Sequence, residues 1–248
     1  MKYLICLCFS FVLIQVQAQE VPEKILFVGN SYTYFWNLPQ TVDLMMESDG
    51  VTIVDTDHST AGGANWGQHW RGEKGLQTQE RIRKGGYDAV ILQNHSMSTI
   101  QRADSFQVFG EKLYELAKST GADVYLYMTW ARAWNPYMQE TITAGYKNFA
   151  EKMGAHIVPV GEAWQRSREL RPDLTLHDPD GTHPNPTGTY LTACVFYHVL
   201  TGKSPVGLPH RLIMEDKDGE TLYLTIQSAN DALFCQKVAE EVVLEWSK

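Results

Sequence analysis

The sequence predicts an α/β protein with a three-layer α/β/α architecture, in which helices cover both faces of a parallel five-stranded sheet. Short apolar runs alternate with longer segments whose apolar residues recur at helical spacing. Strand, helix and strand repeated in this order form parallel sheets in α/β proteins. The predicted strands are apolar throughout, as expected when both faces of a sheet are covered.

The predicted strands are short apolar runs flanked by Gly, Asn or Ser. They span residues 24–29, 51–57, 87–93, 123–129 and 156–160. Between them, apolar residues at helical spacing predict four helices. These helices span residues 38–48, 75–84, 104–119 and 138–153.

After residue 186 the pattern changes. A helix is predicted over residues 187–200, followed by a hairpin whose strands, 211–215 and 221–227, flank a Lys-Asp-Gly turn. The chain then continues into an amphipathic helix over residues 229–246. The candidate core contacts of this helix are Leu233, Val238, Val242 and Leu244.

Residues 1–18 have the pattern of an export signal. Lys2 supplies a positive start, residues 3–16 are apolar, and Ala18 ends the segment with the kind of small residue that signal peptidases require. The apolar stretch is too short to span a membrane, which takes about 20 residues. A buried N-terminal helix is the alternative. We expect a signal peptide and export to the periplasm or the extracellular space.

Residues 19–248 are enough for one well-packed domain and scarcely enough for two. We expect a single domain with a core over about residues 24–201. The remaining residues, about 202–248, form a C-terminal appendage made of the hairpin and the final helix. The sequence contains no internal repeat or low-complexity linker that would divide it further.

The chain is acidic, with 21 Lys and Arg against 29 Asp and Glu and a net charge of −8. An acidic chain without blocks of Lys and Arg is poorly suited to bind nucleic acid or an anionic membrane surface. Removal of the signal peptide would leave two cysteines, Cys194 and Cys235, both in apolar helical patterns. Export would permit a disulfide between them, but we expect buried free thiols.

A serine follows the first predicted strand, at the exit of residues 24–29. The backbone N–H of Ser31 at such a strand-to-helix turn can face a developing negative charge. Its hydroxyl becomes a nucleophile only when a base takes the proton and a third group orients that base. A helix-capping or turn serine is the alternative role.

The loop of residues 178–185 supplies a base and a carboxylate. Asp180 lies three residues before His183, a spacing at which the carboxylate can reach the ring of the histidine. Asp178 could serve in its place, and an Asx turn beside a surface histidine is the alternative interpretation. Ser31, Asp180 and His183 are therefore candidate catalytic residues, since their order along the chain does not matter.

Two further segments fall at the carboxyl ends of strands, where ligands bind to open parallel sheets. Gly62 and Gly63 follow the second predicted strand, and Gln93 and Asn94 end the third. A backbone N–H of Ser31 and of one of the glycines, with one of the two amide side chains, could hold an oxyanion. A simple turn, and an amide that satisfies loop carbonyls, are the alternatives.

In this pattern the chain resembles the SGNH hydrolases, also called the GDSL-like esterase family. Four sequence marks characterise that family. In chain order they are a Ser after Gly-Asp or Gly-Asn, a Gly, an Asn, and a His with Asp three residues earlier. Residues 29–31 match the first mark, Gly62 or Gly63 the second, and Asp180 with His183 the last. At the third mark the family has Gly-x-Asn-Asp, whereas residues 92–95 are Leu-Gln-Asn-His.

The resemblance covers about residues 24–201 and extends to exported bacterial proteins of this clan that carry domains of unknown function. It implies a flavodoxin-like fold and ester hydrolysis without a metal. Ser31 would attack the acyl carbonyl, His183 would take the proton and return it to the leaving alcohol, and Asp180 would orient the ring. The sequence has no metal, phosphate-loop or dinucleotide motif, so we expect no metal and no other cofactor.

Seven tryptophans and twelve tyrosines are many for this length. Several lie in predicted loops near the catalytic edge: Tyr32, Tyr34, Trp36, Trp66, Trp70, Trp130 and Trp134. Flat aromatic faces suit sugar rings, although most such residues complete the core. We expect Trp66 and Trp130 to line the cleft.

Export and these aromatic residues together predict a small-molecule or glycan ester as the substrate, with acetyl or another short acyl group on carbohydrate as the first hypothesis. A lipase or thioesterase type of acyl hydrolase is the second. A carbohydrate-binding protein without turnover is the third, because the third family mark is altered.

Overall fold

The structure is a computed structural model that describes residues 21–50 and 55–247. Five parallel strands form the central sheet in the order β2-β1-β3-β4-β5, which is the flavodoxin-like order. The strands are β1 (Lys24–Gly29), β2 (Asp55–Thr60), β3 (Ala89–Leu92), β4 (Asp123–Tyr127) and β5 (His156–Val158). The predicted fold class is confirmed.

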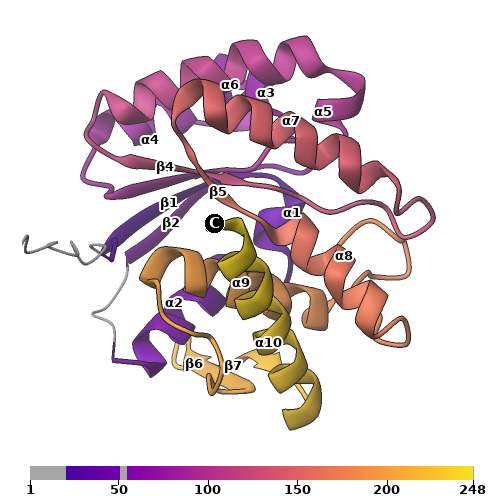
Figure 1. The fold of residues 1–248 in the computed structure, drawn as a ribbon. Coiled ribbons are helices and arrows are strands. Elements are labelled where there is room, and N and C mark those ends of the chain that lie inside the picture. The colour runs from indigo at the N-terminus through magenta and orange to yellow at the C-terminus, as the bar shows by residue number, and fades with distance from the viewer. Residues whose placement is uncertain (1–20, 51–54, 248) are drawn as a thin grey trace, which may run out of the picture.

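Helices cover both faces of the sheet (Figure 1). One layer contains α3 (Trp66–Arg71), α4 (Thr78–Lys84), α5 (Ser98–Gln101), α6 (Ala103–Lys118) and α7 (Met138–Met153). The other contains α2 (Leu38–Ser48), α8 (Val160–Leu170), α9 (Pro186–Thr201) and α10 (Ala229–Trp246). The hairpin of β6 (Arg211–Glu215) and β7 (Thr221–Ile226) packs against α2 and α9 on this second side.

Alternate residues of the central strands pack against the two helical layers, because successive side chains in a strand point to opposite faces. Ile25 and Phe27 of β1 belong to the core that α2, α9 and α10 complete. Leu26 and Val28 belong to the core that α6 and α7 complete. All four side chains are fully buried, so β1 is apolar throughout as predicted.

The register of the strands places three loops side by side. Gly29 at the end of β1 pairs with Thr60 at the end of β2, and Val28 pairs with Leu92 at the end of β3. The segments that follow these strands therefore leave the sheet at one edge. Ligands in flavodoxin-like folds bind at this edge, where β1 and β3 lie next to each other.

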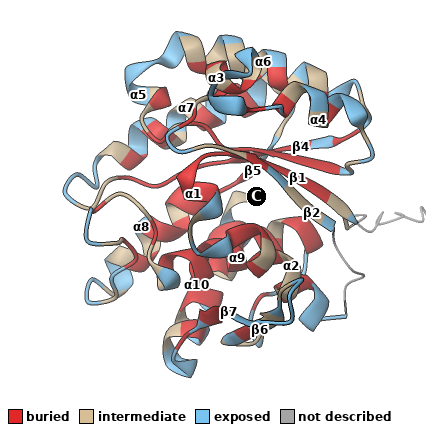
Figure 2. Ribbon diagram, turned by 180° about the vertical axis from the view of Figure 1, so that it is seen from behind, coloured by how far each residue is buried: buried red, intermediate tan, exposed pale blue. Residues whose placement is uncertain are grey.

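Helix α9 is buried along nearly its whole length (Figure 2). Asn185 caps it by accepting a hydrogen bond from the N–H of Gly188 (2.9 Å), and Pro186 begins the first turn without needing a donor. At Gly188 a Cβ would stand 2.3 Å from the carbonyl oxygen of Leu176. This close approach fixes the start of α9 against the loop that contains Asp180 and His183.

The second predicted strand, residues 51–57, overlaps β2, which extends beyond the predicted end. Residues 51–54 lie outside the described residues, and β2 continues to Thr60. The extension to Thr60 was not predicted because β2 is an edge strand with a polar sequence, Asp-Thr-Asp-His-Ser-Thr, so its pairing with β1 rather than its hydropathy defines it. Helices α3 and α8 were not predicted, because they carry many polar residues.

Two of the four core contacts predicted for α10 are wrong. Val238 and Val242 are buried, whereas Leu233 and Leu244 are exposed. The buried face of α10 meets α9 and α8, and the two leucines lie on the other face. Cys194 and Cys235 are buried free thiols, as expected.

The predicted signal peptide, residues 1–18, lies outside the described residues. Across the described part of the chain, every helix is too short or too polar to cross a membrane.

We predict that Gly110→Ala destabilises the protein, although alanine is the better helix former by about 1 kcal/mol. A Cβ at Gly110 in α6 would stand 2.7 Å from the ring of Trp66 and 2.8 Å from that of Phe149. Overpacking of this kind costs about 1–3 kcal/mol, and urea denaturation measures it. Val108→Ala at an exposed position of α6 is the matched control. A rise in stability for Gly110→Ala would contradict the packing described here.

Candidate active site

Ser31 begins the short helix α1 (Ser31–Tyr34) directly after β1 and is 8% exposed. The preceding residue, Asn30, holds this turn from three sides. Its N–H donates to Oε1 of Gln93 (2.8 Å), its Nδ2 donates to the carbonyl of Ala64 (2.9 Å), and its Oδ1 accepts from the N–H of Tyr32 (3.0 Å). The three loops at the sheet edge are thereby tied to the residue before the serine.

Neighbouring side chains also pack tightly around Gly29, the last residue of β1. A Cβ there would stand 2.3 Å from Oγ1 of Thr33 and 2.5 Å from Oε1 of Gln93, so a side chain would displace this turn. The carbonyl of Gly29 accepts a hydrogen bond from Nε2 of His69 (3.0 Å), and Nδ1 of His69 accepts from the hydroxyl of Thr78 (2.7 Å). Burial lowers the pKa of His69 to about 4, so the ring is neutral and its tautomer is fixed by these partners.

A chain of hydrogen bonds joins the three candidate catalytic residues. The hydroxyl of Ser31 lies 2.8 Å from Nε2 of His183, and Nδ1 of His183 lies 2.5 Å from Oδ2 of Asp180. Because Nδ1–H of His183 donates to the carboxylate of Asp180, Nε2 is left without a proton and accepts from the serine hydroxyl. We call Ser31, His183 and Asp180 the candidate triad.

Hydrogen bonds within its own loop position the carboxylate of Asp180 and favour its ionised form. Oδ1 accepts from the N–H groups of Thr182 (2.8 Å) and His183 (2.9 Å). Burial opposes ionisation, but the hydrogen bonds from His183 and Thr182 outweigh it and hold the pKa of Asp180 well below its usual range. Asp178 contributes its backbone instead, since its N–H donates to the carbonyl of His183 (2.9 Å).

Aromatic rings fix the orientation of His183. Phe35 stacks on the imidazole with ring centroids 4.4 Å apart, and Tyr32 meets it edge-on at 5.4 Å. The indole N–H of Trp36 donates to the carbonyl of Pro184 (2.9 Å). Trp36 and Asn37 have φ of 52° and 53°, a left-handed conformation that is costly outside glycine. No sequence pattern indicated Phe35 as a residue of the site.

Of the two candidate amide donors, Gln93 is fully buried and points into the protein. Its Oε1 accepts from the N–H of Asn30 and from the hydroxyl of Thr33, and its Nε2 donates to the carbonyl of Asn94. Of the two amides predicted as alternative oxyanion donors, Gln93 thus directs its donor, Nε2, to the backbone of Asn94 and its acceptor, Oε1, to the turn before Ser31, which favours Asn94 as the donor.

Asn94 has a different arrangement. Its Oδ1 accepts from the N–H groups of Trp66 (3.0 Å) and His95 (2.8 Å). These two bonds fix which side of the amide is oxygen, and no acceptor within the described residues takes the Nδ2 protons. Asn94 thus has donors to offer at the end of β3.

The loop after β2 carries the candidate glycines. Gly63 has φ of 62°, which suits glycine, and the N–H of Ala64 closes a turn onto Ala61 (3.0 Å). Gly62 accepts a hydrogen bond at its carbonyl from Nζ of Lys74 (2.5 Å). The hydrogen bond from the side chain of Asn30 to the carbonyl of Ala64 holds this loop, with both Gly62 and Gly63, beside α1.

The two tryptophans expected in the cleft are both buried. Trp66 is fully buried against Phe106, with ring centroids 4.7 Å apart. Trp130 is stacked between Tyr32 (4.6 Å) and Trp164 (3.8 Å). The expectation is therefore wrong for Trp66, which belongs to the core. Trp130 supports the site from behind, since its indole N–H donates to the carbonyl of Thr182 (3.0 Å).

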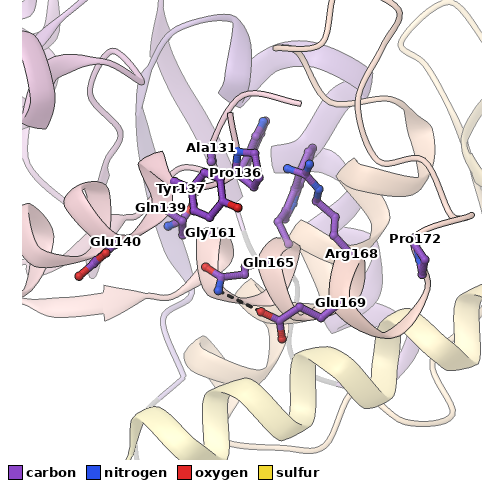
Figure 3. A pocket seen from close by; sticks show the side chains of 12 residues that line it. Ala131, Pro136, Tyr137, Gln139, Glu140, Gly161, Gln165, Arg168, Glu169 and Pro172 are labelled. Carbon is purple, nitrogen blue, oxygen red and sulfur yellow. Dashed lines mark hydrogen bonds between the residues drawn. The ribbon is translucent and has the colours of Figure 1, made fainter. Parts of the chain in front are cut away.

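A cavity of about 500 Å³ lies next to Trp130, and Figure 3 shows most of the residues that line it. Its wall comes from the segment between β4 and α7 and from α8, where Gln165 donates to Glu169 (3.0 Å). Trp130 lines this cavity, but no residue of the candidate triad does.

The exposed aromatic side chains near the triad are different ones. Trp134 is 68% exposed and its ring lies against Gly181, where a Cβ would stand only 2.7 Å away. Trp36 is 45% exposed, and Tyr34 is also exposed. Trp36 and Trp134 therefore contact the loop of Asp180 and His183, and they replace Trp66 and Trp130 as the candidate sugar-contacting residues.

Arg132 also reaches the site, and sequence patterns did not indicate it. Its guanidinium donates to the hydroxyl of Tyr32 (2.5 Å) and to that of Ser96 (2.9 Å). Burial raises the pKa of Tyr32 against the opposing charge of Arg132. A single arginine in a long loop has no sequence pattern that would distinguish it.

Within the described residues, no three His, Cys, Asp or Glu side chains come together as a metal site requires.

Neither a protein-family model nor a curated protein matches the sequence. Solved structures do match. A DUF4886 family protein from Bacteroides uniformis aligns with a TM-score of 0.69 at 18% identity, over 91% of this chain and 96% of that chain. A protein from Slackia heliotrinireducens, provisionally assigned as an SGNH hydrolase, aligns with a TM-score of 0.62 at 22% identity, over 73% and 98%.

A catalytic mutant of an acetylxylan esterase from Geobacillus stearothermophilus aligns with a TM-score of 0.59 at 14% identity, over 75% of this chain and 97% of that chain. The chain has the SGNH hydrolase fold. The predicted resemblance is confirmed at the level of fold, and the SGNH fold places the ends of β1, β2 and β3 at one edge in this chain as well.

We predict that stability falls as pH falls from 6.5 to 4, and that His69 causes part of the fall. The folded ring has a pKa of about 4 against 6.5 for an ordinary histidine, so the unfolded chain binds more protons in this window. Protonation therefore favours unfolding, by up to about 3 kcal/mol near pH 4. Urea denaturation at pH 7 and pH 4.5 measures the loss.

The variant His69→Gln keeps an amide donor for Gly29 without the titrating ring, so it should lose less stability over the same interval. His58→Gln, at an exposed position of β2, should behave like the wild type. Equal pH dependence in wild type and His69→Gln would contradict a neutral buried ring.

Proposed function

We propose that the protein is a serine esterase that removes acetyl or other short acyl groups from carbohydrate. The hydrogen-bonded chain from Ser31 through His183 to Asp180 carries this proposal. A hydroxyl, an imidazole and a carboxylate hydrogen-bonded in this order constitute an activated nucleophile. The SGNH fold alone would not fix the activity, because one fold hosts many functions.

In the first half of the reaction, Oγ of Ser31 attacks the carbonyl carbon of the ester while Nε2 of His183 takes the hydroxyl proton. The carbonyl oxygen becomes an anion in the tetrahedral intermediate. The backbone N–H of Ser31, that of Gly62 or Gly63, and Nδ2 of Asn94 supply donors for it.

The intermediate then loses the alcohol. The bond between the carbonyl carbon and the alcohol oxygen breaks, and His183 returns its proton to that oxygen. Asp180 remains ionised and stabilises the imidazolium formed between the two transfers. Water repeats the sequence on the acyl-enzyme, which releases the acid and restores Ser31.

Exposed rings support carbohydrate as the molecule that carries the acyl group. Trp36 and Trp134 contact the loop of His183 from different segments, and their faces are open to solvent. Aromatic faces of this kind pack against the apolar side of a sugar ring. One structural neighbour is an acetylxylan esterase, so the SGNH fold accommodates such a substrate. The export signal predicted over residues 1–18 supports action outside the cytoplasm.

We predict that Ser31→Ala abolishes hydrolysis of 4-nitrophenyl acetate, with a loss of roughly a thousandfold or more in kcat, because the nucleophile is gone. Release of 4-nitrophenolate measures the rate. Ser228→Ala, at the cap of α10, is a serine control remote from the candidate triad. Turnover that survives in Ser31→Ala would remove Ser31 as the nucleophile.

The same assay over acyl chain length tests the acyl specificity. Rates should be highest for the acetyl ester and fall for longer chains. Rates that rise from two to eight carbons would favour the lipase or thioesterase alternative over the short-acyl proposal.

We predict that Asn94→Ala lowers kcat by on the order of a hundredfold, about 3 kcal/mol, with little change in KM. The reason is that Nδ2 would bind the oxyanion more strongly than the substrate carbonyl. Gln93→Ala is the comparison: it should lower the melting temperature, because the turn at Asn30 loses its acceptor. Full activity in Asn94→Ala would show that the third oxyanion donor is not at the end of β3.

A further inference from the structure

Two basic side chains from separate segments, Lys74 and Arg132, lie near His95 at the carboxyl edge of the sheet. Lys74 reaches across to the carbonyl of Gly62 (2.5 Å). Arg132 donates to the hydroxyl of Ser96, which follows His95 in the chain. Both cations are therefore fixed beside the loops that carry the candidate oxyanion donors.

A third basic residue, Arg102, lines a cavity of about 180 Å³ together with His95 and Gly63. The cavity thus adjoins the candidate oxyanion loop after β2. Three amide side chains share its wall: Asn65, Gln68 and Gln101. Amide and guanidinium groups offer several hydrogen-bond donors to a polar ligand.

None of Lys74, Arg102 and Arg132 is in an ion pair among the residues that the structure describes. Glu73, the carboxylate next to Lys74 in the chain, is bound by Arg71 at 2.5 Å. The positive charge at this edge is therefore available to a ligand. It stands out because the chain as a whole has a net charge of −8.

His95 completes the wall as a neutral donor. Burial first, and then the charges of Arg132, Arg102 and Lys74, hold the pKa of His95 below its ordinary value. Its Nδ1 accepts from the N–H of Met97 (3.3 Å), so Nε2 carries the proton.

We propose that Lys74, Arg102 and Arg132 form a subsite for a carboxylate on the sugar whose acyl ester is cleaved, so that the substrate is an acylated glycan containing uronic acid. This inference rests on the proposed esterase function. Arginine and lysine bind carboxylates through charge-assisted hydrogen bonds, and a local positive field on an acidic protein concentrates anions at the site. The neutral amide side chains in the wall of this cavity would form hydrogen bonds with the sugar hydroxyls.

The test separates binding from turnover. Calorimetry measures the affinity of a galacturonate pentasaccharide for the Ser31→Ala protein, with a neutral galactose pentasaccharide as the reference. Adding Lys74→Gln and Arg102→Gln should weaken galacturonate binding roughly tenfold, as should raising the salt from 0.05 to 0.5 M. Adding Arg211→Gln and Lys217→Gln, exposed on the hairpin, should leave it unchanged.

Equal affinity for the charged and neutral sugars, or galacturonate binding that survives the Lys74 and Arg102 changes, would overturn the subsite. If a sulfated oligosaccharide binds more tightly than galacturonate, the subsite recognises sulfate and not carboxylate. That result would overturn the assignment to uronic acid.

Kinetics on the enzyme with Ser31 intact distinguish failure of the subsite from failure of the function. The ratio of kcat/KM for acetylated oligogalacturonate to that for neutral acetylated xylo-oligosaccharide should fall roughly tenfold in the Lys74→Gln/Arg102→Gln variant. Serine-dependent turnover without this preference would overturn the subsite alone. Charge-dependent binding without any serine-dependent turnover would overturn the proposed function and keep the anion site.

Discussion

Asn30 connects the three loops that form the carboxyl edge of the sheet, and the position of Ser31 depends on those connections. Its backbone donates to Gln93 after β3, and its side chain donates to Ala64 after β2 and accepts from Tyr32 in α1. All of these groups are buried, so losing one partner would leave an unsatisfied polar group. The serine is thus placed by hydrogen bonds between loops more than by the helix that it begins.

The histidine is placed by a different means. Asp180 binds one ring nitrogen, and Phe35 and Tyr32 pack against the ring. The stack of Tyr32, Trp130 and Trp164 continues behind the site into the core beneath α8. Rigid aromatic packing therefore holds the base, whereas the polar network holds the nucleophile. Both arrangements are made entirely by side chains and backbone of the protein itself, which is the kind of preorganisation that catalysis requires.

The sequence predicted most of the fold and the members of the candidate triad, because strand periodicity fixes which loops share an edge. It could not choose between Gln93 and Asn94. Both amides are buried, and only long-range hydrogen bonds decide that Gln93 accepts from the turn before Ser31 whereas Asn94 accepts from the start of α3. It also misplaced Trp66, because the burial of a tryptophan depends on distant partners such as Phe106 in α6. The end of the polar strand β2 at Thr60 was missed for a related reason: pairing with β1, not hydropathy, defines this edge strand.

The central claim is that His183 activates Ser31 as a nucleophile. A fluorophosphonate reagent, which attaches covalently to activated serines, tests it directly when intact mass and peptide mapping locate the adduct. The structure predicts one adduct on Ser31 in the wild type and almost none at the same reagent concentration in His183→Ala. An adduct on another serine, or equal labelling of Ser31 without His183, would contradict the account.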